Sequence, residues 1–136
     1  MKQLAEAQEY REEKPGARIV QYYGKLASAG TGQVVFDDVP SEPLEIPNTP
    51  EFQRVSYAIG VNGGSMEPLY SDGDILLVEP TNDISIGEIG LFIVDNESFV
   101  KKLGNGELIS LNKEYNNIPL TNGSNCSGRV VDKLKQ

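Results

Sequence analysis

The sequence predicts a mainly β fold, and three observations lead to this prediction. The apolar runs between residues 18 and 134 are short and rich in valine, isoleucine, tyrosine and phenylalanine, which favour strands. Glycine, proline, asparagine and aspartate interrupt these runs at regular spacing, as turns between strands do. The length of 136 residues suits one domain with its own core. We therefore expect a single all-β domain over residues 18–136.

The individual elements follow from the same patterns. Residues 1–14 are expected to form a short helix with a thin apolar stripe, ended by Pro15-Gly16, so that residues 1–17 precede the domain as a helical or linker segment. Residues 37–54 contain four prolines and are expected to be an extended, irregular connection. The expected strands cover residues 18–23, 33–36, 55–62, 74–79, 88–95, 98–103, 107–111 and 128–134.

One hairpin places a lysine in an unusual position. Its two strands flank a polar turn at Asp95-Asn96-Glu97. Because side chains alternate along a strand, Phe99, Lys101 and Leu103 share one face, while Lys102 points to the other. Lys101 therefore lies on the side expected to face the core, where burial lowers the pKa of an amine. The pattern leaves two interpretations open: a neutral base, or a side chain that reaches solvent from a sheet edge.

A second candidate site residue is a serine in the stretch VNGGSMEPLYSDGDILLVEP, residues 61–80. Ser65 follows two glycines, and a turn at Asp72-Gly73 then leads into an apolar strand. A serine held on a glycine loop is a candidate nucleophile. It is equally a candidate turn residue that caps its own backbone.

Composition narrows the chemistry that this serine can take part in. The chain has no histidine, which excludes Ser-His-Asp and Cys-His mechanisms and histidine-ligated metal sites. A nucleophilic serine would therefore need lysine as its base, and such a pair requires no cofactor and no metal.

The net charge of −8 disfavours nucleic-acid binding by this domain itself. The single cysteine, Cys126, precludes an internal disulfide and fits a reducing compartment. No apolar run is long enough to span a membrane, and the first residues lack the apolar stretch of a signal peptide, so a cytoplasmic location is expected.

Three of these segments, taken in order, resemble the LexA-like self-cleaving proteins, a family that includes LexA, the phage CI-type repressors and UmuD. They are GGSMEP around Ser65, DGD at residues 72–74, and FVKKL at residues 99–103. The tail is also similar, with LISLNKEYNNIPL like the family's strand and Asn-x-x-Tyr/Phe turn, and SGRVVDKL like its last strand. The resemblance implies a LexA-like C-terminal catalytic and dimerisation domain of short, highly bent strands. It further implies that Ser65 is the nucleophile, that Lys101 is the base, and that backbone N–H groups at Gly64 and Ser65 form an oxyanion hole.

The resemblance also implies a substrate inside the chain. The family cuts its own backbone at an Ala-Gly or Cys-Gly bond about 35 residues before the serine. The segment YYGKLASAGTG carries Ala29-Gly30 at that separation (65 − 30 = 35), within a cleavage segment over residues 22–34. Small side chains there allow the close approach that nucleophilic attack needs. The other interpretation of ASAGTG is a flexible linker.

The implied function is the C-terminal domain of a transcriptional repressor, most like a Gram-positive prophage CI-type protein. Self-cleavage would abolish dimer-dependent repression in an SOS or prophage-induction switch. The implied partners are a second copy of the chain and either the RecA filament or an antirepressor as inducer. DNA would be bound only through a helix-turn-helix domain that this chain lacks, since about 29 residues precede the expected cut and carry no two-helix pattern.

Three other functions compete with this one. A non-cleaving dimerisation module controlled by an antirepressor would keep the fold without the catalysis. A UmuD-like translesion polymerase accessory protein would be a short chain complete in itself. A Ser-Lys signal peptidase acting on other proteins is disfavoured, because no membrane anchor is seen and a suitable bond lies within the chain.

Overall fold

The structure is a computed structural model that describes residues 16–24 and 40–135. Three predictions lie outside the described residues: the helix at 1–14, the strand at 33–36 and the bond between Ala29 and Gly30. The rest of the chain is mainly β, as the sequence predicts, and its strands join in one mixed sheet.

The last of the described strands, with 10 residues, is the longest, and the others have seven residues or fewer. They are β1 Ala17–Tyr23, β2 Glu42–Pro47, β3 Tyr57–Gly60, β4 Ile75–Glu79, β5 Ile89–Val94, β6 Glu97–Leu103, β7 Glu107–Ile109, β8 Ile118–Pro119 and β9 Ser124–Lys133, with a 3-10 turn at Pro50–Phe52. Their order across the sheet is β2-β1-β3-β4-β9-β5-β6-β7-β8. Neighbouring strands are antiparallel except β1 and β3, which are parallel.

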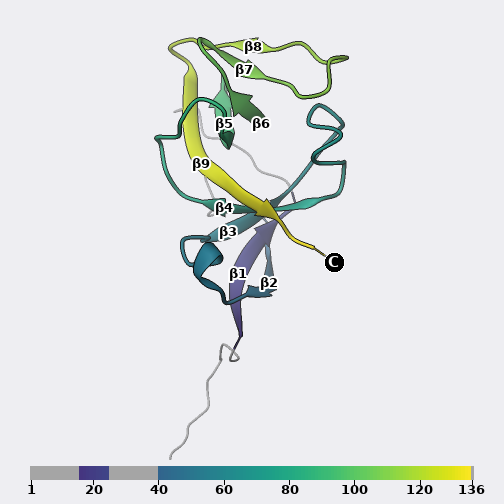
Figure 1. Ribbon diagram of the computed structural model, residues 1–136, viewed down its shortest axis with the longest axis vertical. Coiled ribbons are helices and arrows are strands. Elements are labelled where there is room, and N and C mark those ends of the chain that lie inside the picture. The colour runs from purple at the N-terminus through teal and green to yellow at the C-terminus, as the bar shows by residue number, and fades with distance from the viewer. Residues whose placement is uncertain (1–15, 25–39, 136) are drawn as a thin grey trace, which may run out of the picture.

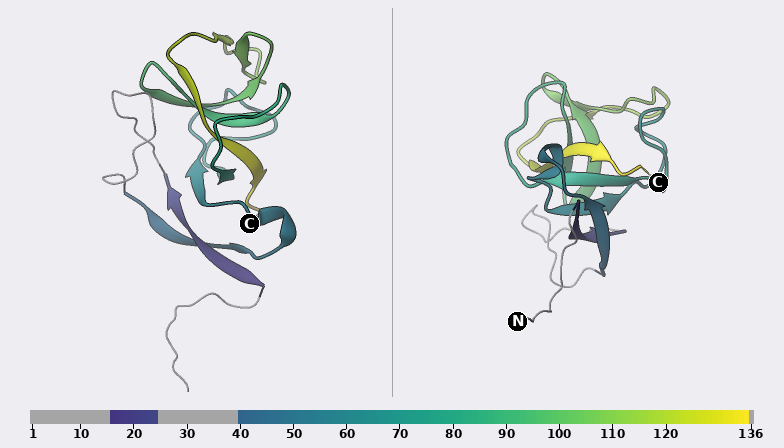
Figure 2. Two further views of the ribbon diagram at one scale, coloured as in Figure 1. Left: turned by 90° about the vertical axis from the view of Figure 1, so that its left-hand side faces the viewer. Right: turned by 60° about the horizontal axis from the view of Figure 1, so that its bottom comes forward.

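Strand β9 joins the two ends of the molecule (Figure 1). It pairs with β4 on one side and with β5 on the other, so β1–β4 lie at one end and β5–β8 at the opposite end. The register of β9 shifts once against each neighbour, between Leu77 and Val78 of β4 and between Leu91 and Phe92 of β5. Such irregularities bend a strand and increase its twist. The sheet is accordingly strongly curved, with β1 and β2 set apart at one end (Figure 2).

Two observed strands were not predicted from the sequence, and both contain proline. Residues 42–47, expected to be irregular, form β2, which pairs with β1 alone. Pro43 and Pro47 are tolerated because an edge strand does not need every N–H for pairing. The two-residue strand β8 at Ile118–Pro119 was also not expected, and it occupies the opposite edge. Strand β9 begins at Ser124, four residues earlier than residue 128, where the prediction began.

The predicted β5–β6 hairpin is confirmed, with a tighter turn than expected. Asp95 and Asn96 have φ angles of 50° and 70°, the left-handed values of a two-residue type I′ turn. Glu97, assigned to the turn from sequence, instead pairs with Val94 as the first residue of β6. This turn fixes the register of the hairpin, which pairs Lys101 with Gly90.

Buried apolar side chains form three clusters along the curved sheet. The cluster at the centre contains residues from β3, β4, β5 and β9, and also Met66, which directly follows Ser65. Its buried members are Tyr57, Ile59, Val61, Met66, Tyr70, Leu76, Val78, Leu91 and Val130. The serine loop is thus attached to the main core by its own neighbour.

Gly128 of β9 is packed too closely for any side chain. A Cβ atom there would lie 2.4 Å from Val78 Cγ1 and 3.1 Å from Tyr57 Oη. Overpacking of this kind typically costs about 1–3 kcal/mol, so we expect Gly128→Ala to lower the free energy of unfolding in urea by that amount. Gly24→Ala is the control, because its Cβ would meet only Tyr22 Oη, at 3.8 Å. Equal free energies of unfolding for the two variants would contradict this packing.

Candidate active site

Lys101 lies buried beside an aromatic ring in β6. Only 5% of the residue is exposed, and its Nζ lies 5.8 Å from the centre of the Phe99 ring. The alternation expected from sequence is therefore observed, and the interpretation in which Lys101 reaches solvent is wrong. Lys102 on the opposite face is more exposed. Burial lowers the pKa of the Lys101 amine, because removal from water penalises its charged form.

The loop that carries Ser65 is fixed at its base by the DGD motif. The N–H of Gly63, which has a φ of 85°, donates to Asp72 Oδ1 at 2.7 Å. Val61 N–H donates to the carbonyl of Asp74 at 2.8 Å, and Gly73 N–H donates to the carbonyl of Val61 at 2.9 Å. The two glycines and the following turn therefore close a loop from which Ser65 projects.

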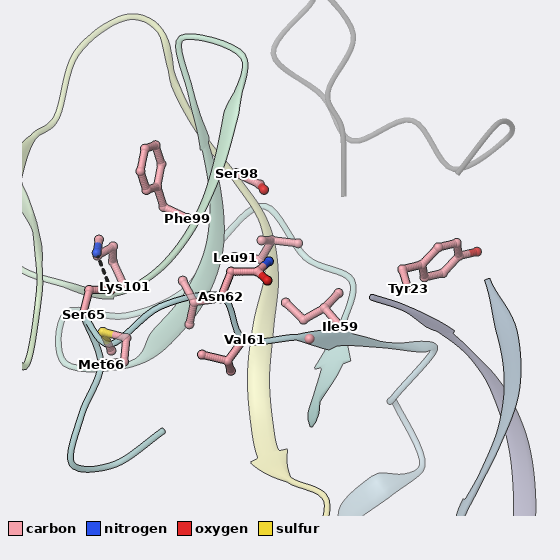
Figure 3. Close-up of a pocket in the computed structure, with 12 residues that line it drawn as sticks. Tyr23, Ile59, Val61, Asn62, Ser65, Met66, Leu91, Ser98, Phe99 and Lys101 are labelled. Carbon is pink, nitrogen blue, oxygen red and sulfur yellow. Dashed lines mark hydrogen bonds between the residues drawn. The ribbon is translucent and has the colours of Figure 1, made fainter. Parts of the chain in front are cut away.

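These two elements bring Ser65 and Lys101 together. Lys101 Nζ lies 2.8 Å from Ser65 Oγ, a hydrogen-bonding distance, although the residues are 36 positions apart (Figure 3). A neutral lysine amine at this distance can accept the serine proton, whereas a charged one can only donate to Oγ. This geometry would allow Lys101 to act as a base toward Ser65, and the lowered pKa of Lys101 favours its neutral form.

Asn112 also contacts this loop, and the sequence did not identify it as a site residue. Its backbone N–H donates to the carbonyl of Ser65 at 2.9 Å, and its side-chain Nδ2 donates to the carbonyl of Gly64 at 2.9 Å. The sequence contained one indication, since Asn112 begins the Asn-x-x-Tyr turn that Tyr115 closes by donating its N–H to the carbonyl of Asn112. Nothing in the pattern indicated that this turn would contact Ser65, 47 positions earlier (112 − 65 = 47).

The predicted oxyanion hole at Gly64 and Ser65 would need backbone N–H groups that are not already bonded to an acceptor. Within residues 16–24 and 40–135, the N–H groups of Gly64, Ser65 and Met66 donate no hydrogen bond. Donors that are held in place without a partner are what an oxyanion hole requires.

A groove leads from this pair toward the end of β1 (Figure 3). Residues 59–62 line one side and residues 98–101 line the other, with Tyr23 at the end away from Lys101. Ser65, Met66 and Leu91 complete the lining. Because consecutive residues line both sides, backbone edges border the groove, and an extended peptide fits such a shape.

Among the described residues, no three histidine, cysteine or acidic side chains are grouped to hold a metal ion. None of the helical segments that the structure describes has the length and apolar character needed to cross a membrane.

Most of the sequence matches a known protein family. The sequence model of the family described as Peptidase S24-like matches residues 21–131, a range that contains Ser65, Lys101 and Asn112. No curated protein matches the chain.

Proposed function

Because the chain belongs to the Peptidase S24-like family, the family of LexA, UmuD and the phage CI-type repressors, we propose that it cuts its own backbone between Ala29 and Gly30. Ser65 is the nucleophile in this proposal and Lys101 is the base. The observation that carries it is the 2.8 Å separation between Ser65 Oγ and the amine of a buried lysine.

The reaction proceeds in two stages. Neutral Lys101 removes the Ser65 proton as Oγ attacks the carbonyl carbon of Ala29. Lys101 then returns that proton to the nitrogen of Gly30, the C–N bond breaks, and Ala29 remains as an ester on Ser65. A water molecule, deprotonated by Lys101, hydrolyses the ester and restores both side chains.

Chain length supports Ala29-Gly30 as the bond that reaches the serine. Tyr23 is the last residue of β1 and pairs in parallel with Ile59. Ser65 lies six residues after Ile59 (65 − 59 = 6), and Ala29 lies six residues after Tyr23 (29 − 23 = 6). An extended segment that continues β1 along the groove would run toward Ser65 and carry Ala29 six residues beyond Tyr23 in that direction.

The strand edges beside the groove support such a docked segment. In the described sheet, residues 98–101 of β6 pair only with β5, and Gly60 pairs only with Ile75 of β4. Edge N–H and C=O groups of this kind can bond an added strand. Docking would cover Lys101 further and lower the pKa of its amine more, so that substrate binding and base activation are coupled.

The proposed biological role is that of a repressor switch. A homodimer of this domain would hold two DNA-binding domains on one operator and so raise the effective concentration of the second. A cut at Ala29-Gly30 would separate the dimerising part from the DNA-binding part, and repression would end. An inducer, the RecA filament or an antirepressor, would act by favouring the docked state of the cleavage segment.

The test of cleavage is intact mass spectrometry after incubation at pH 7 and near pH 10, because a rise in pH increases the neutral fraction of a lysine. We expect two fragments of 29 and 107 residues (136 − 29 = 107), formed faster at the higher pH because more Lys101 is neutral. If the folded chain stays whole at both pH values and also with activated RecA filament, the non-cleaving dimerisation module becomes the better explanation.

A further inference from the structure

We propose that Asn112 is a positioning residue that holds two consecutive peptide planes so that the N–H groups of Ser65 and Met66 face the reacting carbonyl. This inference rests on the proposed function of Ser65. It assigns a role to the turn after β7, which lies outside the groove and, within the described chain, hydrogen-bonds no groove-lining residue other than Ser65.

Peptide planarity fixes the direction of two N–H groups in the serine loop. In a trans peptide the C=O and the following N–H point in opposite directions. Asn112 binds the carbonyl oxygen of Gly64 through Nδ2 and that of Ser65 through its backbone N–H, both at 2.9 Å. The N–H groups of Ser65 and Met66, which share those two planes, must therefore point away from Asn112. Neither of them donates a hydrogen bond within the described residues.

The orientation of the Asn112 side chain follows from its other partner. Glu114 N–H donates to Asn112 Oδ1 at 3.0 Å, and an N–H requires an acceptor. The oxygen of the amide must therefore face Glu114, which leaves Nδ2 for the carbonyl of Gly64. The donor role of Nδ2 is thus fixed by the hydrogen-bond network.

The turn that carries Asn112 is itself held firmly. Ser110 is fully buried, its N–H donates to Asn117 Oδ1 at 3.0 Å, and its Oγ donates to the carbonyl of Asn116 at 3.1 Å. Tyr115 N–H closes the turn on the carbonyl of Asn112 at 3.0 Å. A rigid support of this kind is what precise placement of catalytic donors requires.

The substitution that tests this role is Asn112→Ser. Serine retains the backbone N–H and an oxygen able to accept from Glu114 N–H, but its side chain is too short to reach the carbonyl of Gly64. The change is uncharged, so it leaves the charges around Lys101 unaltered. The matched control is Asn116→Ser in the same turn, since the exposed Asn116 contributes only its backbone carbonyl to the network.

The first readout is the self-cleavage rate of the full chain over a series of pH values. We expect Asn112→Ser to lower the high-pH plateau by about 10²-fold, the lower end of the loss seen when an oxyanion donor is removed. The pH midpoint should not move, because Lys101 and its surroundings are unchanged. Asn116→Ser should match the wild type in both quantities. A purely structural role for Asn112 would lower the free energy of unfolding and leave the plateau of the folded protein unaltered.

The second readout does not depend on self-cleavage. A small alkyl fluorophosphonate reacts with an activated serine: the bond from Ser65 Oγ to phosphorus forms, the P–F bond breaks, fluoride leaves and Lys101 takes the serine proton. Intact mass spectrometry gives the labelling rate, which should fall by a similar factor in Asn112→Ser alone. A wild-type chain that is labelled but never cut would contradict the proposed cleavage and leave this comparison intact.

Three results would overturn the role of Asn112. The Asn112→Ser variant could cleave and label at the wild-type plateau rate. The Asn116→Ser control could slow as much as Asn112→Ser. The wild-type chain could also fail to label at Ser65 at any pH, in which case there is no activated nucleophile to position.

Discussion

Replacing Ser65 with alanine is expected to leave the chain whole under every condition in which the wild type produces fragments. The change removes the one atom, Oγ, that lies 2.8 Å from Lys101 Nζ and could attack a carbonyl. Loss of a protease nucleophile typically lowers the rate by roughly 10⁶-fold, which is beyond detection here. The measurement is intact mass spectrometry over the time in which wild-type cleavage goes to completion.

The control for this variant is Ser71→Ala, six residues further along the same loop. Ser71 uses only backbone atoms in its hydrogen bonds to Asp74, so alanine preserves both of them. It should cleave at the wild-type rate. Fragments that meet at Ala29-Gly30 in the Ser65→Ala chain would show that another group attacks the bond, and would end the assignment of Ser65.

The hairpin is the part of the site that the sequence predicted best. Two-residue periodicity placed Lys101 with Phe99 on the buried face and Lys102 on the other, and the structure agrees. This worked because a short polar turn fixes the register of a hairpin, and register alone decides which face each side chain takes. The local sequence pattern was therefore enough to predict that the Lys101 side chain is buried.

The edges of the sheet were predicted least well, for a physical reason. Strand β2 contains Pro43 and Pro47, and proline normally indicates that a strand is absent. Only the position of β2 at the edge makes these prolines acceptable, and edge position is a property of the whole sheet. The parallel pairing of β1 with β3 is likewise a long-range property.

The contact that Asn112 makes within the site could not be predicted from the sequence either. Its side chain bonds the carbonyl of Gly64, 48 residues earlier, and no local periodicity encodes such a contact. The proposed pair of Ser65 and Lys101 could be predicted from the sequence, because the lack of histidine left lysine as the base for a serine and the motifs resembled a known family. A residue that acts through backbone carbonyls has no comparable chemical requirement, and only the folded structure identifies it.

Replacing Lys101 with methionine is expected to abolish cleavage and at the same time to stabilise the fold at neutral pH. Methionine fills a similar volume without a basic nitrogen, so no group remains within reach of Ser65 Oγ to take its proton. Lys102→Met is the control, because Lys102 lies on the opposite face of β6 and should leave the cleavage rate near that of the wild type. Cleavage by Lys101→Met at the wild-type rate would exclude Lys101 as the base.

The gain in stability has a pH dependence whose sign follows from the lowered pKa of Lys101. Burial holds the pKa of the folded state below that of the unfolded chain, so the unfolded state binds more protons between the two values. Wild-type stability must therefore rise with pH across that window, and at neutral pH burial of the amine costs free energy that methionine does not incur. Urea unfolding should find Lys101→Met more stable than Ser65→Ala at pH 7, with the difference shrinking as pH approaches about 10.4, the ordinary pKa of lysine. A difference that grows with pH would mean that Lys101 is stabilised in its charged form, and a charged Lys101 could not act as the base.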